Sequence, residues 1–362
     1  MSDVTGSATE GRAPSAHPVV DEVVDVAVVG AGPCGLAAAI AAQRAGLRAV
    51  VLDRGCLVNG IASYPTYMSF FSTAERISIG GVPFIVATDK PTRRDALAYY
   101  RGVADVYDLD VRQYERVETL QSLPAGVEAP SAPGGASHRA PRWLLRSVQR
   151  TGGVRQVATH AVVIATGYFG RPNRLGVPGE SLPHVQHGYV EGHSAWREPV
   201  VIVGGANSAV DAALDMYRAG ARVTMVHFGD TLDSNVKPWV RPDIEARLRE
   251  GTIGARFGAR VVAIEPDAVV VRGPQGDERL PATQVYTMTG YLPETGLLEQ
   301  IGVPIDPDSG IPAHDPLTMA TPFPGVYLAG VIASGNQANR IFIENGRDHG
   351  DAIVAHLQSS WR

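Results

Sequence analysis

The chain has 362 residues, of which 44% are hydrophobic and 19% charged, and its formal net charge at pH 7 is −5. This length predicts about two domains, and the acidic balance without a basic block argues against a nucleic-acid binder. No apolar run reaches the roughly 18 residues of a membrane helix. Residues 1–21 lack the apolar core of a signal peptide, so we expect a cytoplasmic protein with a disordered tail at 1–22. Two cysteines, Cys34 and Cys56, without zinc-ligand spacing predict neither a disulfide framework nor a metal site.

The first pattern, at residues 24–55, is an apolar strand, a tight glycine turn, a helix and a second strand. Its turn carries G-x-G-x-x-G, which lets the backbone approach a pyrophosphate and points a helix N-terminus at it. Asp53 ends the second strand, where its carboxylate can accept a hydrogen bond from a ribose hydroxyl. The unit therefore predicts an adenine dinucleotide site. Its expected binding residues are Gly30, Gly32, Pro33, Cys34, Gly35, Asp53 and Arg54.

Further elements of the same domain follow. Residues 90–109 predict a helix opened by Pro91 and Thr92, and a strand is expected at 114–117. The Pro-, Gly-, Ala- and Ser-rich stretch at 123–142 predicts an exposed loop between two strands of a small antiparallel layer. We assign this loop no chemistry.

A strand at residues 160–169 runs into an Ala-Thr-Gly sequence, after which the chain is expected to cross into a second domain. Glycine at the end of a strand permits a close approach of the backbone to a ligand. We therefore expect this strand end to border the first dinucleotide. The additional contact residues are Val117, Ala165, Thr166 and Gly167.

The strand-turn-helix-strand pattern recurs at residues 199–229, displaced by 174 positions, so that Gly204 corresponds to Gly30. A duplicated unit of this kind predicts a second dinucleotide. His227 stands where the first copy has Asp53, and an imidazole can donate a hydrogen bond to a 2′-phosphate that a carboxylate would repel. NADPH is therefore favoured over NADH. The expected binding residues are Gly204, Gly205, Asn207, Ser208, Ala209 and His227.

The last segments return the chain to the first domain. Residues 285–293 make the crossing, a strand ends at Gly330, and a long helix begins near Asn339 to Ile341, with its N-terminus toward the first cofactor. Gly330, Asn339 and Ile341 are therefore further expected cofactor-binding residues. We predict an α/β fold of two Rossmann-like, three-layer dinucleotide-binding domains, the NADPH domain inserted in the FAD domain. The expected FAD-binding domain comprises 23–190 and 289–362, and the NADPH-binding domain 191–288.

Several motifs together resemble a known family. The chain resembles the YpdA-type bacillithiol disulfide reductases, which belong to the low-molecular-weight thioredoxin reductase-like architecture. The segments that carry this resemblance are GAGPCGLAAA, SYPTYMSFFST, KPTRRDALAYYR, VKPW and IFIENGR. The resemblance implies a flavoprotein that uses FAD and NADPH to reduce a small-molecule disulfide, bacillithiol disulfide. Val331 and Ile332 stand where the wider architecture usually places an aspartate. Phe228 replaces an arginine that many NADPH-binding relatives carry, so Lys237 or Arg241 is expected to supply that charge.

Cys34 is the candidate catalytic residue. At the start of the first helix, partial positive charge is expected to lower the pKa of its thiol. The alternative is a small residue wanted for packing. Residues 168–288 contain no cysteine, so thioredoxin reductase chemistry through C-x-x-C is not expected.

Two other functions stay open. A ferredoxin or flavodoxin-NADP reductase of the same fold would make Cys34 incidental, and a flavin-binding sensor would be no enzyme. For partners we expect a small-molecule disulfide and neither nucleic acid nor membrane. A homo-oligomer remains an option.

Overall fold

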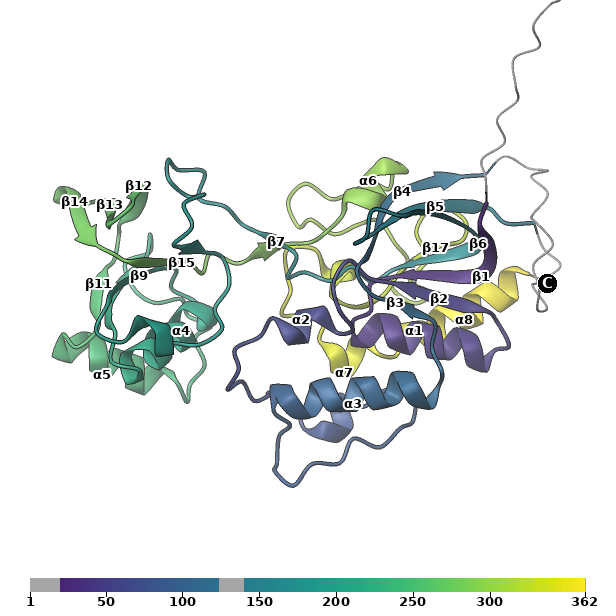
Figure 1. Ribbon diagram of the computed structural model, residues 1–362, viewed down its shortest axis with the longest axis horizontal. Helices are drawn as coiled ribbons and strands as arrows, with labels where there is room; N and C mark the ends of the chain where they lie inside the picture. The colour runs from purple at the N-terminus through teal and green to yellow at the C-terminus, as the bar shows by residue number, and fades with distance from the viewer. Residues whose placement is uncertain (1–19, 124–139, 362) are drawn as a thin grey trace, which may run out of the picture.

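The computed structural model describes residues 20–123 and 140–361. Most of the tail expected at 1–22 and of the loop expected at 123–142 therefore lies outside the described residues. Figure 1 shows a larger and a smaller lobe joined by narrow crossings. One crossing is an antiparallel pair of two-residue strands, β7 (Arg171–Pro172) and β16 (Tyr291–Leu292). The smaller lobe is thus inserted within the chain of the larger one.

The larger lobe is built on one mixed sheet in the order β3-β2-β1-β6-β5-β4, with β17 also paired to β6. β1, β2, β3, β6 and β17 run parallel, and β4 and β5 form the antiparallel layer expected on either side of the 123–142 stretch. The parallel core strands are apolar and almost completely buried, as strands covered on both faces must be. The strands are β1 (Glu22–Val29), β2 (Ala49–Leu52), β3 (Val111–Arg112), β4 (Glu115–Ser122), β5 (Trp143–Gln149), β6 (Val154–Ile164) and β17 (Val326–Leu328).

Helices cover this sheet, and the first and last helices lie side by side although they are far apart in sequence (Figure 1). A Cβ on Gly350 would lie 2.6 Å from the Cα of Ala38, so glycine is what lets these two helices touch. The helix expected after Pro91 is confirmed, with Thr92 and Asp95 forming a capping box. The helices are α1 (Pro33–Arg44), α2 (Asn59–Ala62), α3 (Arg93–Val106), α6 (Gly296–Gln300), α7 (Ile343–Gly346) and α8 (His349–Ser360), with short 3₁₀ turns η1 (Ala74–Arg76) and η3 (Gly330–Ser334).

The smaller lobe has its own parallel sheet, in the order β11-β10-β9-β15-β8, and a separate three-stranded antiparallel sheet that the sequence did not predict. Its parallel strands are β8 (Val185–Gln186), β9 (Pro199–Val203), β10 (Arg222–Val226), β11 (Gly254–Arg256) and β15 (Gln284–Thr287). The antiparallel strands are β12 (Arg260–Glu265), β13 (Ala268–Gly273) and β14 (Gly276–Pro281). The helices are α4 (Asn207–Arg218), α5 (Arg241–Glu250) and the 3₁₀ turn η2 (His193–Ala195).

Two expectations differ from the structure. β8 pairs with β15 in the second sheet, so residues 185–186 join the smaller lobe although the expected boundary was residue 190. The single long C-terminal helix is instead α7 and α8, and α7 begins at Ile343 rather than near Asn339. The Asn345 side chain accepts from the Phe342 N–H at 2.7 Å and donates to the Arg340 carbonyl at 2.9 Å, which fixes a non-helical entry. None of the helices in the described part of the chain is long and apolar enough to span a bilayer.

Candidate active site

The glycine turn between β1 and α1 is closed by a strand from later in the chain. The Gly30 N–H donates to the Leu52 carbonyl at 2.8 Å, and Gly30 has φ +114°, a region that L side chains rarely adopt. A Cβ on Gly30 would lie 2.2 Å from the Ala165 carbonyl oxygen, and one on Gly35 would lie 2.0 Å from the Gly30 oxygen. Above Gly32, by contrast, nothing lies within 4 Å of a Cβ position. The turn is thus tight on its inner side and open where a pyrophosphate would approach, which fits FAD.

Asp53 follows β2 and braces this turn. Its Oδ2 accepts from the Ala31 N–H and its Oδ1 from the Gly55 N–H, both at 2.7 Å. Each carboxylate oxygen keeps a second lone pair for a ribose hydroxyl, so the expected role remains compatible with this geometry. Arg54 forms an ion pair with Glu294 at 3.0 Å, and its guanidinium lies beside Gly170, next to β7.

The second unit repeats the contacts by which the first turn is closed. The Gly204 N–H donates to the Val226 carbonyl at 2.9 Å, and a Cβ on Gly204 would lie 2.5 Å from the Met288 oxygen. Met288 therefore stands at the second turn where Ala165 stands at the first. Each helix also ends at an arginine and is followed two residues later by a glycine with positive φ. The duplication expected from the sequence is confirmed as a duplication of geometry.

His227 packs directly on the second turn. A Cβ on Gly205 would lie 2.7 Å from three atoms of its imidazole ring, and only 4% of the residue is exposed. Its Nε2 lies 3.5 Å from the Asp233 carboxylate, and its buried Nδ1 has no hydrogen-bond partner among the described residues. A buried polar atom without a partner is costly, so this nitrogen is suited to a ligand group.

Other predicted residues of the second turn are placed as follows. The Asn207 side chain donates to the Asn235 carbonyl at 3.1 Å and accepts from the Lys237 N–H at 3.0 Å, which ties the 235–240 loop to the start of α4. Ala209 is fully buried beneath the turn, and Ser208 is exposed.

Cys34 is the first-turn residue that faces the C-terminal part of the larger lobe. A Cβ on Gly330 would lie 3.0 Å from its Sγ, and one on Gly346 would lie 2.8 Å from the same atom. Burial raises the pKa of this thiol to about 12, and the Asp348 carboxylate adds to the shift. The expectation of a lowered pKa is wrong for this structure, because segments from the far end of the chain cover the thiol.

The remaining residues predicted for the first site lie in several different segments of the larger lobe. The Thr166 hydroxyl donates to the Glu294 carbonyl at 3.1 Å, and Gly167 has φ +75° with open space above it. Val117 lies in β4 at a bulge, and Asn339 is exposed. Ile341 lies against Gly346, because its Cγ2 is 3.2 Å from a Cβ built there.

Sequence reasoning missed His349 and Tyr64. The His349 Nδ1 accepts from the Gly330 N–H at 3.2 Å, and burial lowers the pKa of this imidazole. Tyr64 packs edge-to-face on Phe169 at 5.6 Å between centroids. Burial raises the pKa of Tyr64 to about 12, and the charge of Cys34 contributes. Tyr64 lies in the SYPTYMSFFST segment but was given no role there, and both residues reach the site by tertiary packing.

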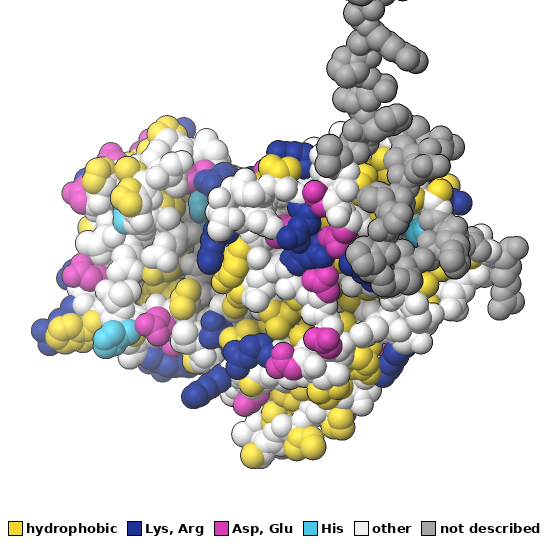
Figure 2. All heavy atoms as spheres, turned by 45° about the vertical axis from the view of Figure 1, so that its right-hand side comes forward, with side chains coloured by type: hydrophobic (Ala, Val, Ile, Leu, Met, Phe, Trp, Pro, Cys, Tyr) yellow, Lys and Arg dark blue, Asp and Glu magenta, His cyan; other side chains and the backbone are white. Residues whose placement is uncertain are grey.

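Basic and aromatic side chains meet where the lobes adjoin. Figure 2 shows Lys and Arg beside hydrophobic side chains along this boundary. The Lys237 Nζ lies 3.2 Å from the Phe71 ring centroid and 3.9 Å from the Asp211 carboxylate, and burial lowers its pKa. Arg241 donates to the Asp233 carbonyl at 2.6 Å and pairs with Glu245. Lys237 and Arg241, which were expected to replace the missing arginine charge, therefore both have other partners in this structure.

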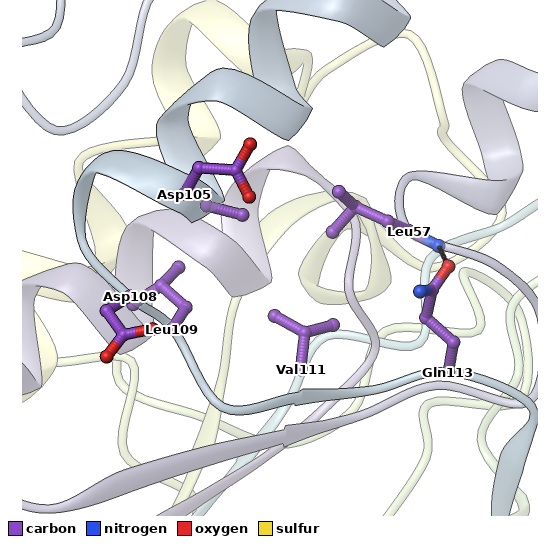
Figure 3. Close-up of a pocket in the computed structure, with 7 residues that line it drawn as sticks. Leu57, Asp105, Asp108, Leu109, Val111 and Gln113 are labelled. Atoms are coloured by element: carbon purple, nitrogen blue, oxygen red, sulfur yellow. Dashed lines mark hydrogen bonds between the residues drawn. The ribbon is translucent and has the colours of Figure 1, made fainter.

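The pocket drawn in Figure 3 is lined by no residue of either glycine turn. It has a volume of about 210 Å³ beside β3, between the end of α3 and Leu57, whose N–H donates to Gln113 at 2.9 Å. Asp105 and Asp108 line it without a facing cation among its lining residues. We assign it no part in the chemistry.

Comparisons with known proteins agree with this geometry. The family model of the pyridine nucleotide-disulphide oxidoreductases matches residues 27–128 and 147–330, so the chain belongs to this family of oxidoreductases. It is 41% identical over 333 residues to the bacilliredoxin reductase Bdr of Bacillus subtilis (strain 168), which covers 91% of this chain and 96% of that protein.

Two solved structures share the fold. The bacillithiol disulfide reductase Bdr (YpdA) from Bacillus cereus matches with a TM-score of 0.86 and 40% identity, covering 93% of this chain and 99% of that one. The enzyme of the same name from Staphylococcus aureus matches with a TM-score of 0.84 and 35% identity, covering 94% of this chain and all of that one. The family resemblance and the mixed α/β fold expected from the sequence are confirmed.

Proposed function

We propose that this protein is an FAD-dependent NADPH oxidoreductase that reduces a low-molecular-weight disulfide, with bacillithiol disulfide as the first candidate. The larger lobe would bind FAD and the inserted smaller lobe NADPH, each as a Rossmann-like domain. Similarity to the Bdr enzymes supports the substrate class. The family supports the pair of cofactors.

One observation carries the proposal. The two lobes repeat the same glycine turn, and only the first copy sets a cysteine at the start of the following helix. The second turn would bind the nicotinamide dinucleotide that donates electrons to the protein. Cys34 places a thiol at the first turn, where the flavin would bind. This combination suits an enzyme that passes electrons from a nicotinamide to a disulfide.

The chain's own residues divide the work. Gly30, Gly32 and Gly35 admit the pyrophosphate of FAD, and Asp53 holds both the turn and the adenosine ribose. FAD, when bound, relays two electrons between the nicotinamide and the disulfide. Overall, NADPH, one proton and one disulfide give NADP⁺ and two thiols.

Cys34 would exchange with the substrate in balanced steps. Its sulfur bonds one sulfur of the disulfide, the other sulfur leaves as a thiolate, and that thiolate takes the proton released by Cys34. Two electrons and two protons then cleave the mixed disulfide, which releases the second thiol and restores Cys34. Because burial raises the pKa of Cys34 to about 12, the resting group is a thiol, and the attack requires loss of its proton on substrate binding.

The test separates the two half-reactions. The Cys34→Ala variant should still let NADPH bleach the bound flavin under anaerobic conditions, because that step needs no thiol, but should lose turnover of bacillithiol disulfide. Cys56→Ala is the matched control, since the Cys56 thiol lies 3.6 Å from the Asn59 side chain and is not at the start of the helix that follows the turn. It should retain both reactions.

Other outcomes select other functions. Undiminished disulfide turnover by the Cys34→Ala variant would make Cys34 a packing residue. Turnover of a ferredoxin or flavodoxin but of no disulfide would select the electron-carrier reductase. A bound flavin that NADPH does not bleach would select a sensor.

A further inference from the structure

The start of β12 lies beside the end of β10, next to the second glycine turn. The His227 N–H donates to the Arg256 carbonyl at 2.9 Å, and the Ala259 N–H donates to the His227 carbonyl at 3.1 Å. The Gly258 N–H donates to the Gly229 carbonyl at 2.9 Å. These backbone hydrogen bonds set Arg260, the first residue of β12, next to Phe228.

Arg260 presents a guanidinium that is oriented but not neutralised. Its Cζ lies 4.9 Å from the centroid of the exposed Phe228 ring. Within the described residues it forms no ion pair, whereas three neighbouring arginines of this lobe each pair with an acid. Those pairs are Arg256 with Glu278, Arg272 with Asp277, and Arg279 with Glu265 and Asp267.

Phe228 carries no charge for a phosphate, but its ring can hold a residue that does. An aromatic face holds a guanidinium by cation–π attraction and leaves the edge N–H groups free. Those groups match the oxygens of a phosphate in a two-point contact. The Phe228 ring lies 4.7 Å, centroid to centroid, from the His227 ring, whose buried Nδ1 has no hydrogen-bond partner among the described residues.

We infer that Arg260, held by Phe228, is the residue that binds the 2′-phosphate of NADPH and sets its preference over NADH. The inference rests on the proposed function, because it assumes a nicotinamide dinucleotide on the second turn. Two acids border the site, Asp233 at His227 and Asp230 near Gly258. Without a cation they would favour a ribose with free hydroxyls, so the charge of Arg260 decides between the two cofactors.

The experiment measures binding, with no need for turnover. Calorimetry on the FAD-saturated protein would compare adenosine 2′,5′-bisphosphate with adenosine 5′-monophosphate, which differ only in the 2′-phosphate. In Arg260→Ala we expect affinity for the bisphosphate to fall at least about tenfold, because a hydrogen-bonded charge pair to phosphate is lost. Affinity for the monophosphate should be unchanged.

Two further variants sharpen the result. Arg222→Ala removes an exposed arginine that also lacks an ion pair among the described residues, but from the opposite end of β10, and should leave both affinities unchanged. Phe228→Leu keeps the charge and removes the ring, so it should weaken the bisphosphate selectively and less than Arg260→Ala does.

The outcomes that overturn the inference are distinct. Equal affinity of the wild type for both probes, an unchanged Arg260→Ala variant, or an equal loss for both probes would each show that Arg260 does not read the 2′-phosphate. In those cases a nucleotide site remains and the proposed function stands. Binding of neither probe by the wild type would overturn the proposed function as well.

Discussion

Replacing Gly346 by alanine should test how tightly the C-terminal segment covers Cys34. The new Cβ would lie 2.8 Å from the Cys34 Sγ and 3.2 Å from both the Gly330 Cα and the Ile341 Cγ2. Such overpacking costs about 1–3 kcal/mol, and the better helix propensity of alanine returns at most about 1 kcal/mol. We therefore expect a net destabilisation of about 1–2 kcal/mol.

A double-mutant cycle isolates the contact with sulfur. In a Cys34→Ala background the Sγ is gone, so the penalty of Gly346→Ala should shrink by about 1 kcal/mol, within the usual range of coupling between touching residues. Urea unfolding followed by far-ultraviolet circular dichroism gives the four free energies, provided that the slope with denaturant stays constant.

The control is another helical glycine. A Cβ on the exposed Gly102 of α3 would have nothing within 4 Å, so Gly102→Ala should stabilise the protein by up to about 1 kcal/mol. The reasoning is refuted if Gly346→Ala is as stable as Gly102→Ala, or if its penalty is the same with and without the sulfur.

Three other predictions concern single side chains. Asp53→Asn should weaken retention of FAD through a desalting column. The carboxylate accepts from two backbone N–H groups, and in the variant one of them would meet the amide NH₂ group, which cannot accept. Full retention of FAD would contradict this. Burial lowers the pKa of His349 in the folded state, so the unfolded state binds more protons below about pH 6.5, and stability should be complete above that pH and fall below it. His349→Gln should flatten this dependence in urea titrations at several pH values. Since burial raises the pKa of Cys34 to about 12, a thiol reagent at pH 8 should label Cys56 before Cys34 in the folded protein, and denaturation should speed the labelling of Cys34. Mass spectrometry of the labelled peptides would show the order.

Local patterns predicted the parts of the fold whose causes are local. The glycine turns at Gly30 and Gly204 each act within one strand-turn-helix unit, and the helix start at Pro91 and Thr92 acts within one helix turn, so the sequence displays them directly. The repeat of 174 residues was equally visible.

What the sequence could not reveal depends on segments distant along the chain. Ala165 and Met288 close the two turns, but only strand pairing shows that they are equivalent. The pKa of Cys34 depends on cover from the far end of the chain, which reverses the effect expected from the helix start alone. Arg260 reaches Phe228 because residues 227–229 and 256–259 hydrogen-bond to each other, and no rule of sequence spacing predicts that contact.

The insertion of the smaller lobe also imposes an order on synthesis. β17 pairs with β6 but emerges only after the whole smaller lobe has been made, which at about 5–20 residues per second is a delay of roughly 10–30 seconds. Until β17 is made, the carboxyl half of β6 has an unpaired edge, although the smaller lobe has all of its strands once Thr287 has been added. Cys34 is among the first residues made, and the glycines that cover it are among the last. In a nascent chain this thiol therefore lacks the packing that Gly330 and Gly346 place around it in the finished fold.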